Sequence, residues 1–339
     1  MENKQSPLKK LLAVRGMGAT ITAFVGLIII YIGFGLKNPA VFSLQNNQNL
    51  LRSMSKYLLI GIAQSYVLIT GNIDLSIGTM VGMSAMISAT LMTHSIPAIP
   101  AMLVALLACL ATGIVNGYLV GHFRLPPFIA TLGTMFVTRG IAYLVNGNRN
   151  TDAISSGIGK EAADRFQNFF YYGKTLGVYN TFWISLVVFI IFFFVLSRTR
   201  TGRHIYAIGS NIDAAKLSGV NVVATTTKAY LVSAFCSCLV GLILCAQAGM
   251  GNMEAGNSYE MYGVAAGVIG GVSPMGGTGL LLGTFMGAAV WQTLENGLNM
   301  IHAQVGIQRI AIGVIVVGAV LLDVVFRNGT FSFGKKKAK

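Results

Sequence analysis

Three ionisable side chains lie in otherwise apolar sequence, where an unpaired charge is costly. Asp74 lies in GNIDLSIGT at 71–79, between the runs YLLIGIAQSYVLIT and MVGMSAMISATLM. Arg139 is in the middle of an apolar segment, and Glu260 lies near the start of another. Ionisable residues in such places are functional candidates by default. What they do depends on the class of protein that carries them.

Enzyme chemistry finds no support in the sequence. The four histidines are scattered without metal-ligand spacing, and no nucleophile is matched to a base. The four cysteines all fall in apolar segments, so we interpret them as small buried hydrophobic residues. We therefore expect neither a metal nor a cofactor in this chain, and energy for any transport has to come from a gradient or another chain.

The composition is that of an integral membrane protein. Of 339 residues, 54% are hydrophobic and 10% are charged, whereas soluble domains have about 25% charged residues. The net charge of +14 comes from Lys and Arg clustered between apolar runs, without the basic and aromatic platform that binds single strands. The predicted partner is a lipid bilayer, and nucleic acid is excluded.

The hydropathy pattern predicts an all-α, polytopic bundle of about ten membrane segments. The segments are 17–36, 57–71, 74–93, 97–121, 126–147, 179–197, 223–248, 261–273, 279–300 and 305–326. Lys- and Arg-rich loops stay in the cytoplasm. This rule places residues 1–16, the loop 198–222 and the basic tail 328–339 in the cytoplasm, and the loop 148–178 outside. Residues 17–327 are then a single membrane domain.

Two of these segments are too short for a simple span. Residues 57–71 reach about 22 Å as a helix, against a hydrocarbon core of about 30 Å. Residues 261–273 are shorter still and rich in glycine. Short, Gly-interrupted segments in two halves of a transporter indicate an internal repeat. We predict an inverted repeat.

The cytoplasmic loop contains SNIDAAKLSG, which has the signals of a short helix. Ser210 or Asn211 can cap its start, Asp213 suits the positive end of the helix dipole, and Gly219 suits the left-handed position after its end. Such a helix is marginal alone in water. The alternatives are a docking element held by a partner and a solvated connector between two spans.

Four stretches in order resemble the permease subunits of monosaccharide (ribose/galactose-type) ABC importers. They are GNIDLSIGT at 71–79, LPPFIATLGTMFVTRGIAYLVNG at 125–147, SNIDAAKLSG at 210–219 and SYEMYGVAAGVIGGVSPMGGTG at 258–279. Two positions depart from the family pattern. Asn72 stands where the family usually has Gly, and Tyr262 where it usually has an acidic residue.

The resemblance implies a type II ABC importer fold in a bacterial cytoplasmic membrane, with both termini cytoplasmic. It implies a pair of identical or related permease chains, two ATPase subunits that bind ATP and Mg, and a periplasmic or lipid-anchored sugar-binding protein. The segment expected to couple this chain to the ATPase includes Gly209, Asn211, Asp213, Ala214, Ala215 and Gly219, with the two alanines giving a flat face.

Several polar residues are candidates for the translocation pathway, each with a structural alternative. Asp74 either contacts the sugar, caps the helix that begins at Leu75, or pairs with a cation such as Arg139. Arg139 otherwise bonds carbonyls near Pro126–Pro127. Glu260 lies at the outer surface, where it either helps seat the binding protein or stabilises a helix N-terminus. The remaining candidates, which can equally join helices to one another, are Ser76, Asn116, Thr131, Thr134 and Asn146.

The alternative function is a secondary transporter of a small polar solute driven by an ion gradient. It needs titratable or ion-coordinating groups within the spans, and Asp74 and Arg139 are the candidates.

Overall fold

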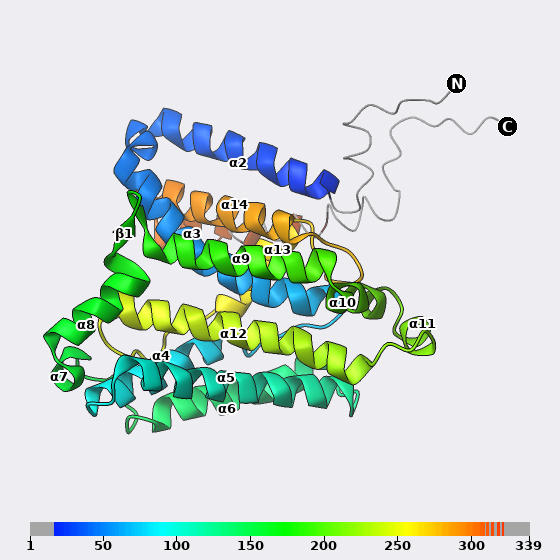
Figure 1. Cartoon of the computed structure of the whole chain (residues 1–339). Helices are drawn as coiled ribbons and strands as arrows, with labels where there is room; N and C mark the ends of the chain where they lie inside the picture. The colour runs from blue at the N-terminus through cyan, green and yellow to red at the C-terminus, as the bar shows by residue number, and fades with distance from the viewer. Residues whose placement is uncertain (1–16, 309, 312, 315–316, 319–320, 322–339) are drawn as a thin grey trace.

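The computed structural model describes residues 17–308 together with 310, 311, 313, 314, 317, 318 and 321. The segments 1–16 and 328–339 lie outside the described residues, as does part of the predicted span 305–326. Figure 1 shows a bundle of long helices with a small hairpin at one end. The elements are α2 (Met17–Lys37), η1 (Pro39–Phe42), α3 (Leu44–Ile69), α4 (Ile77–Thr93), α5 (Ala98–Gly121), α6 (Pro127–Leu144), α7 (Ser155–Ile158), α8 (Lys160–Gln167), η2 (Asn168–Tyr172), β1 (Lys174–Thr175), β2 (Val178–Tyr179), α9 (Asn180–Arg198), α10 (Arg200–Ser210), α11 (Ile212–Leu217), α12 (Val222–Ala248), α13 (Tyr259–Ile269) and α14 (Leu281–Met300).

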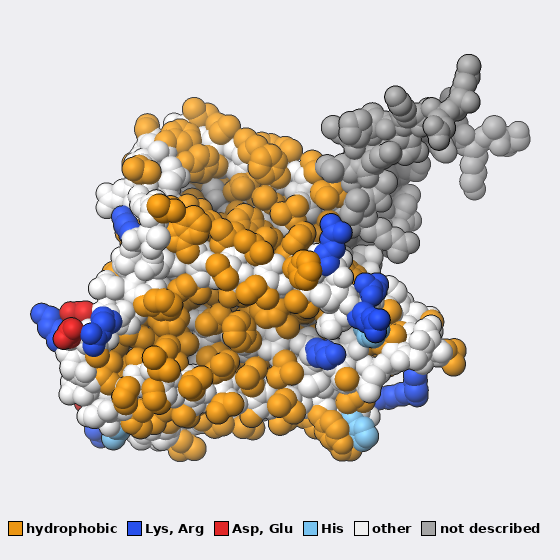
Figure 2. Space-filling view, viewed as in Figure 1, with side chains coloured by type: hydrophobic (Ala, Val, Ile, Leu, Met, Phe, Trp, Pro, Cys, Tyr) orange, Lys and Arg blue, Asp and Glu red, His pale blue; other side chains and the backbone are white. Residues whose placement is uncertain are grey.

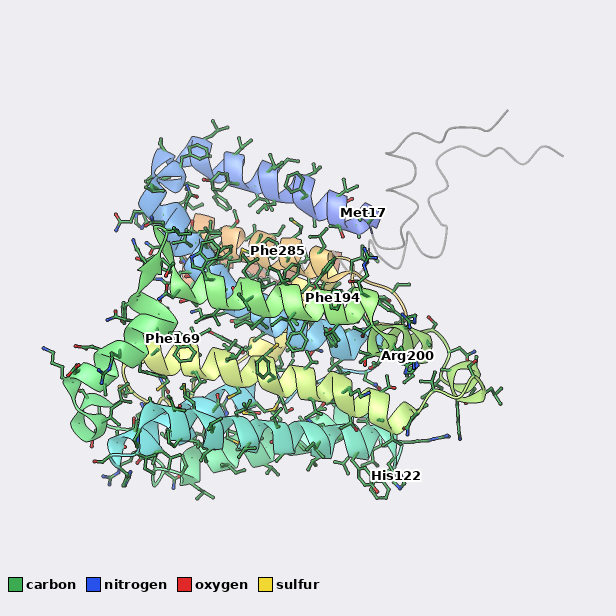
Figure 3. All side chains as sticks on the ribbon, viewed as in Figure 1. Met17, His122, Phe169, Phe194, Arg200 and Phe285 are labelled. Atoms are coloured by element: carbon green, nitrogen blue, oxygen red, sulfur yellow. The ribbon has the colours of Figure 1, made fainter. Side chains whose placement is uncertain are left out.

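The bundle has two ends that differ in their short elements. One carries α10 and α11 and is called the α11 end; the other carries α7 and α8 and is called the α8 end (Figure 1). Arg200 and His122 lie at the α11 end, and Phe169 lies towards the α8 end (Figure 3). The long helices run between the two ends.

The face of the bundle that Figure 2 shows is largely apolar. Large side chains such as Ile29, Leu107, Phe136 and Phe194 are at least 60% exposed. Among the described residues, five helices are long and apolar enough to cross a membrane: α2, α5, α6, α9 and α12. The predicted all-α membrane bundle is therefore confirmed, whereas the count of ten spans is not reproduced.

The prediction of a short span at 57–71 is wrong. Helix α3 has 26 residues and begins at Leu44, because Ser43 caps its start by accepting a hydrogen bond from the Asn46 N–H. Its first half was missed because its sequence, LQNNQNLLRSMSK, is polar. These polar residues pair with α14: the Asn46 and Asn296 side chains bond each other, and Tyr57 donates to Glu295 at 2.6 Å.

Two stretches of the bundle have the same element order, as the predicted inverted repeat requires, with boundaries other than those predicted. The two units are α3–α4–α5 and α12–α13–α14, and in each a non-helical segment, 71–76 or 249–258, precedes the second helix. The long helices α3 and α12 are antiparallel, since Lys56 bonds Gln247 and Tyr230 bonds the carbonyl of Ile73.

Both long helices of the repeat end at a glycine with left-handed backbone. Gly71 follows α3 with φ +78°, and Gly249 caps α12 with φ +67°. Glycine adopts this conformation without the strain that a Cβ causes. The chain then turns into the bundle, so that α4 and α13 begin side by side: a Cβ on Gly78 would overlap Glu260 and the carbonyl of Gly256.

Candidate functional site: a buried polar network and an exposed docking helix

Asp74 is fully buried and accepts three hydrogen bonds from neutral groups. Its Oδ1 accepts from the Ser76 N–H at 2.9 Å and the Ser76 hydroxyl at 2.6 Å. Its Oδ2 accepts from the Ser233 hydroxyl of α12 at 2.6 Å. Among the described residues no ion pair joins Asp74 to Arg139, so the pairing alternative is wrong. The carboxylate holds the chain before α4, which begins at Ile77 rather than Leu75.

The hydrogen bonds of Asp74 extend into a network across five parts of the fold. Asn116 of α5 donates to the Ser76 hydroxyl at 3.0 Å, and Thr134 of α6 donates to Asn116 Oδ1 at 2.7 Å. Thr79 and Thr138 share a bond of 2.6 Å between α4 and α6. We call this set of residues, Asp74, Ser76, Thr79, Asn116, Thr134, Thr138 and Ser233, the Asp74 network. Its members supply one another with hydrogen-bond donors and acceptors, which is how buried polar groups avoid a desolvation penalty.

The structure therefore gathers some of the predicted pathway residues and separates others. Asp74, Ser76, Asn116 and Thr134 belong to one network. Thr131 donates instead to the Pro127 carbonyl of its own helix at 2.7 Å. Asn146 stabilises an exposed turn by donating to the carbonyls of residues 149 and 150. Sequence reasoning missed Thr79, Thr138 and Ser233, since isolated hydroxyls in apolar helices carry little signal.

Arg139 binds carbonyls, but not those near Pro126–Pro127. Its Nη1 donates to the carbonyl of Met253 at 2.5 Å and to that of Ala255 at 3.4 Å. It therefore attaches α6 to the non-helical segment 249–258.

Glu260 does not lie at the outer surface, which corrects the sequence prediction. It is half-buried in the first turn of α13, beside Gly78. The reason is that residues 249–258 continue from α12 into the bundle without helical structure before α13 begins.

Helix α11 has the predicted caps. Asn211 accepts from the Ala214 N–H at 2.9 Å, Asp213 lies in the first turn, and Gly219 follows the helix with φ +82°. The expected flat face of two alanines is wrong, because Ala215 is buried and only Ala214 is exposed.

The exposed surface of α11 instead has two large apolar side chains that the sequence analysis did not single out. Leu217 is 90% exposed and Ile212 is 47% exposed. Both project from a helix outside the five membrane-length helices.

Helix α10 contacts the end of α3 and the turn 273–279 between α13 and α14. A Cβ on Gly209 would overlap the Ile69 carbonyl oxygen at the end of α3. That same carbonyl accepts from the Gly277 N–H at 2.9 Å, and the Tyr206 hydroxyl donates to the Gly279 carbonyl at 2.6 Å. Gly209 is thus an internal packing residue, and α10 connects α11 to the turn 273–279.

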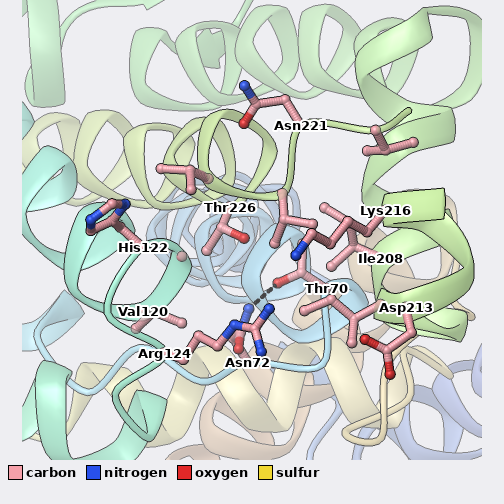
Figure 4. A pocket seen from close by; sticks show the side chains of 15 residues that line it. Thr70, Asn72, Val120, His122, Arg124, Ile208, Asp213, Lys216, Asn221 and Thr226 are labelled. Carbon is pink, nitrogen blue, oxygen red and sulfur yellow. Dashed lines mark hydrogen bonds between the residues drawn. The ribbon is translucent and has the colours of Figure 1, made fainter. Parts of the chain in front are cut away.

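A cavity of about 380 Å³ opens at the α11 end between α5, α10, α11 and the start of α12 (Figure 4). Asn72, one of the two departures from the family pattern, lines it and donates to the Thr70 hydroxyl at 2.8 Å. The other departure, Tyr262, packs against the rings of Tyr57 and Trp291. Neither residue belongs to the Asp74 network. No group of three His, Cys, Asp or Glu among the residues described here is placed to hold a metal ion.

An apolar exterior and five membrane-length helices among the described residues define a polytopic membrane protein, and paired non-helical interruptions such as 71–76 and 249–258 are typical of transporters. Residues 46–325 match the family described as "Branched-chain amino acid transport system / permease component". The chain belongs to this family of transport permeases.

Curated relatives cover most of the chain. The ribose import permease protein of Haemophilus influenzae is 35% identical over 301 residues, 89% of this chain and 92% of the relative. The D-allose transport system permease protein of Escherichia coli is 33% identical, covering 89% and 90%. The galactose/methyl galactoside import permease protein of H. influenzae is 31% identical, covering 93% and 94%. No solved structure matches the chain.

Proposed function

We propose that this chain is the permease subunit of an ATP-binding-cassette importer and forms the translocation pathway for a monosaccharide. The match to import permeases for ribose, allose and galactose over nine-tenths of the chain carries this proposal. These relatives are named for three different sugars and match at similar identity, so the comparison does not single out one sugar. A soluble binding protein, periplasmic or lipid-anchored, delivers the sugar.

The ion-driven alternative fits the geometry less well. Asp74 is fully buried and occupied by three hydrogen bonds, and Arg139 is attached to backbone carbonyls. Neither offers a free site for a coupling ion. Energy comes instead from hydrolysis of ATP, which separate ATPase subunits bind together with Mg.

The charges support an orientation with the α11 end in the cytoplasm of a bacterium. Basic residues gather there, as Figure 2 shows near α10 and α11. They are Arg124, Arg198, Arg200, Arg203, Lys216 and Lys228. The α8 end mixes both signs, as in the pair of Arg165 with Glu161 at 2.9 Å. Positive charge is retained on the cytoplasmic side. In this orientation the binding protein docks at the α8 end, and the termini are cytoplasmic.

In this proposal, α11 docks into the ATPase through Ile212, Ala214 and Leu217. Movement of α11 reaches the bundle through α10, because Gly209 and Tyr206 contact the end of α3 and the turn 273–279. A second permease chain, identical or related, completes the pathway, since the Asp74 network is buried within this one.

Uptake in cells tests the proposal. A bacterium that lacks this chain is given it back with its ATPase and binding protein, and uptake of labelled ribose, allose and galactose is measured. The proposal predicts uptake of at least one sugar that stops when ATP is depleted and persists with a protonophore while ATP is maintained. Uptake that stops with the protonophore at unchanged ATP would show the ion-driven alternative instead.

A further inference from the structure

A second cavity, of about 480 Å³, lies where the two repeat units meet towards the α8 end. It is bounded by the middle of α3, by α4, by the end of α12 and by the non-helical segment before α13. We call it the Lys56 cavity. Its polar lining residues are Lys56, Gln247, Asn252, Glu254, Asn257 and Tyr259. Its size is within the range of about 300–1,000 Å³ that is usual for small-molecule sites.

The Lys56 cavity differs from the Asp74 network in having unused hydrogen-bonding groups. Among the residues that the structure describes, the Lys56 ammonium donates only to Gln247 Oε1, at 3.4 Å, and so keeps two N–H donors. Within the described part of the chain, neither the Asn257 amide nor the Tyr259 hydroxyl has a hydrogen-bond partner. Three side chains from α3, the non-helical segment and α13 therefore bring free donors and acceptors to one space.

The charges around the cavity favour an uncharged ligand. Glu295, which accepts from Tyr57 at 2.6 Å, acts electrostatically on Lys56. The Glu254 carboxylate also lines the cavity. An anion would meet the Glu254 carboxylate at the lining, and Glu295 already balances the charge of Lys56, whereas a polyol uses ammonium, amide and phenol groups together. The apolar side chains of Ala85 and Leu244 complete the lining and suit the C–H face of a sugar ring.

We propose that the Lys56 cavity is a monosaccharide-binding station within a single permease chain, occupied between delivery and translocation. The inference rests on the proposed function, because it names a site for the same cargo. Lys56 and Asn257 bond the ring hydroxyls, and Tyr259 bonds them from the start of α13. Sequence analysis missed the station, because its predicted second segment begins one residue after Lys56.

Site-directed labelling tests the station directly. The full chain, assembled with its ATPase in nanodiscs, carries Asn257→Cys and is labelled with a membrane-impermeant maleimide. The four native cysteines are buried, and labelling of the unsubstituted chain gives their background, including that of Cys245, which lines the cavity. We expect the transported sugar, whether ribose, allose or galactose, to slow the rate of labelling at least fivefold, with an effect that saturates as the sugar concentration rises. Lys160→Cys on the exposed helix α8 is the matched control, and its labelling should be unchanged by the sugar.

Three results would overturn the inference. They are no labelling of Asn257→Cys without sugar, labelling that the transported sugar does not slow, or protection by ribose 5-phosphate instead of the neutral sugar. If the complex takes up the sugar but the sugar does not protect, the station is wrong and the proposed function stands. If the complex takes up no monosaccharide, the proposed function fails first.

Transport kinetics provide a second readout. Lys56→Met removes the donors and keeps the length of the side chain, so the sugar concentration for half-maximal uptake should rise at least tenfold. Lys228→Met, on the exposed face of α12 near the α11 end, should leave it unchanged. An unchanged half-maximal concentration in Lys56→Met would contradict the assignment.

Discussion

Asp74 and Ser233 are 159 residues apart in sequence, and their side chains bond at 2.6 Å in the buried middle of the bundle. The bond joins the non-helical segment before α4 to α12, and so links the two repeat units. A carboxylate at the start of a broken helix therefore stabilises the fold with both of its oxygens, which accounts for its position in apolar sequence.

Removing the Asp74 carboxylate should destabilise the protein. Asp74→Ala leaves the Ser76 and Ser233 donors buried without partners, at a cost of about 1–3 kcal/mol. We expect a lower thermal unfolding midpoint for the purified protein in detergent. Asp213→Ala, at an exposed position in α11, should cost at most about 1 kcal/mol. An Asp74→Ala protein that is as stable as the wild type but transports nothing would instead indicate direct sugar contact.

Gly209 should not tolerate a side chain. The Cβ of Gly209→Ala would overlap the Ile69 carbonyl, and overpacking of this kind costs about 1–3 kcal/mol. The expected result is a lower unfolding midpoint together with lower uptake. Gly133→Ala in α6 is the control, because nothing lies within 4 Å of its Cβ position. Equal stability of the two variants would show that α10 does not pack against α3 as described.

Leu217→Glu should weaken binding of the ATPase and leave the fold intact, because the side chain is 90% exposed. Co-purification of the ATPase with the permease should fall at least tenfold at an unchanged unfolding midpoint. Leu176→Glu is the matched control at the α8 end, where the side chain is 87% exposed. Retention of the ATPase by Leu217→Glu would exclude α11 as the docking element.

Arg139→Met should loosen the non-helical segment that Arg139 holds through the carbonyls of Met253 and Ala255. We expect amide hydrogen exchange to increase several-fold in residues 250–258. Arg165→Met removes an exposed i,i+4 ion pair worth about 0.3–0.5 kcal/mol and should leave exchange there unchanged. Identical hydrogen exchange in both variants would show that Arg139 does not anchor this segment.

Helix α11 was predictable because its signals are local, whereas contacts between distant segments were not predictable from the sequence. Its caps at Asn211 and Gly219 depend on residues within a few positions, and the sequence shows both. Helix α3 was cut short because its polar first half is stabilised by Asn296 and Glu295 of α14, about 240 residues away.

The predictions of where Glu260 lies and which group pairs with Asp74 failed for the same reason as the prediction of α3. The depth of Glu260 depends on the path of segment 249–258 through the bundle, and the partner of Asp74 comes from the other repeat unit. Hydropathy and spacing report the local chain, so neither the path nor the partner could be read from them.

ATP-driven uptake by the purified system tests the central claim most directly. The permease and its ATPase are reconstituted in liposomes with ATP and Mg on the side of the α11 end, and binding protein with labelled sugar on the other. We predict sugar accumulation that requires ATP, Mg and the binding protein, and we expect that an imposed proton or sodium gradient cannot substitute for ATP. Accumulation driven by such a gradient without the ATPase would contradict it.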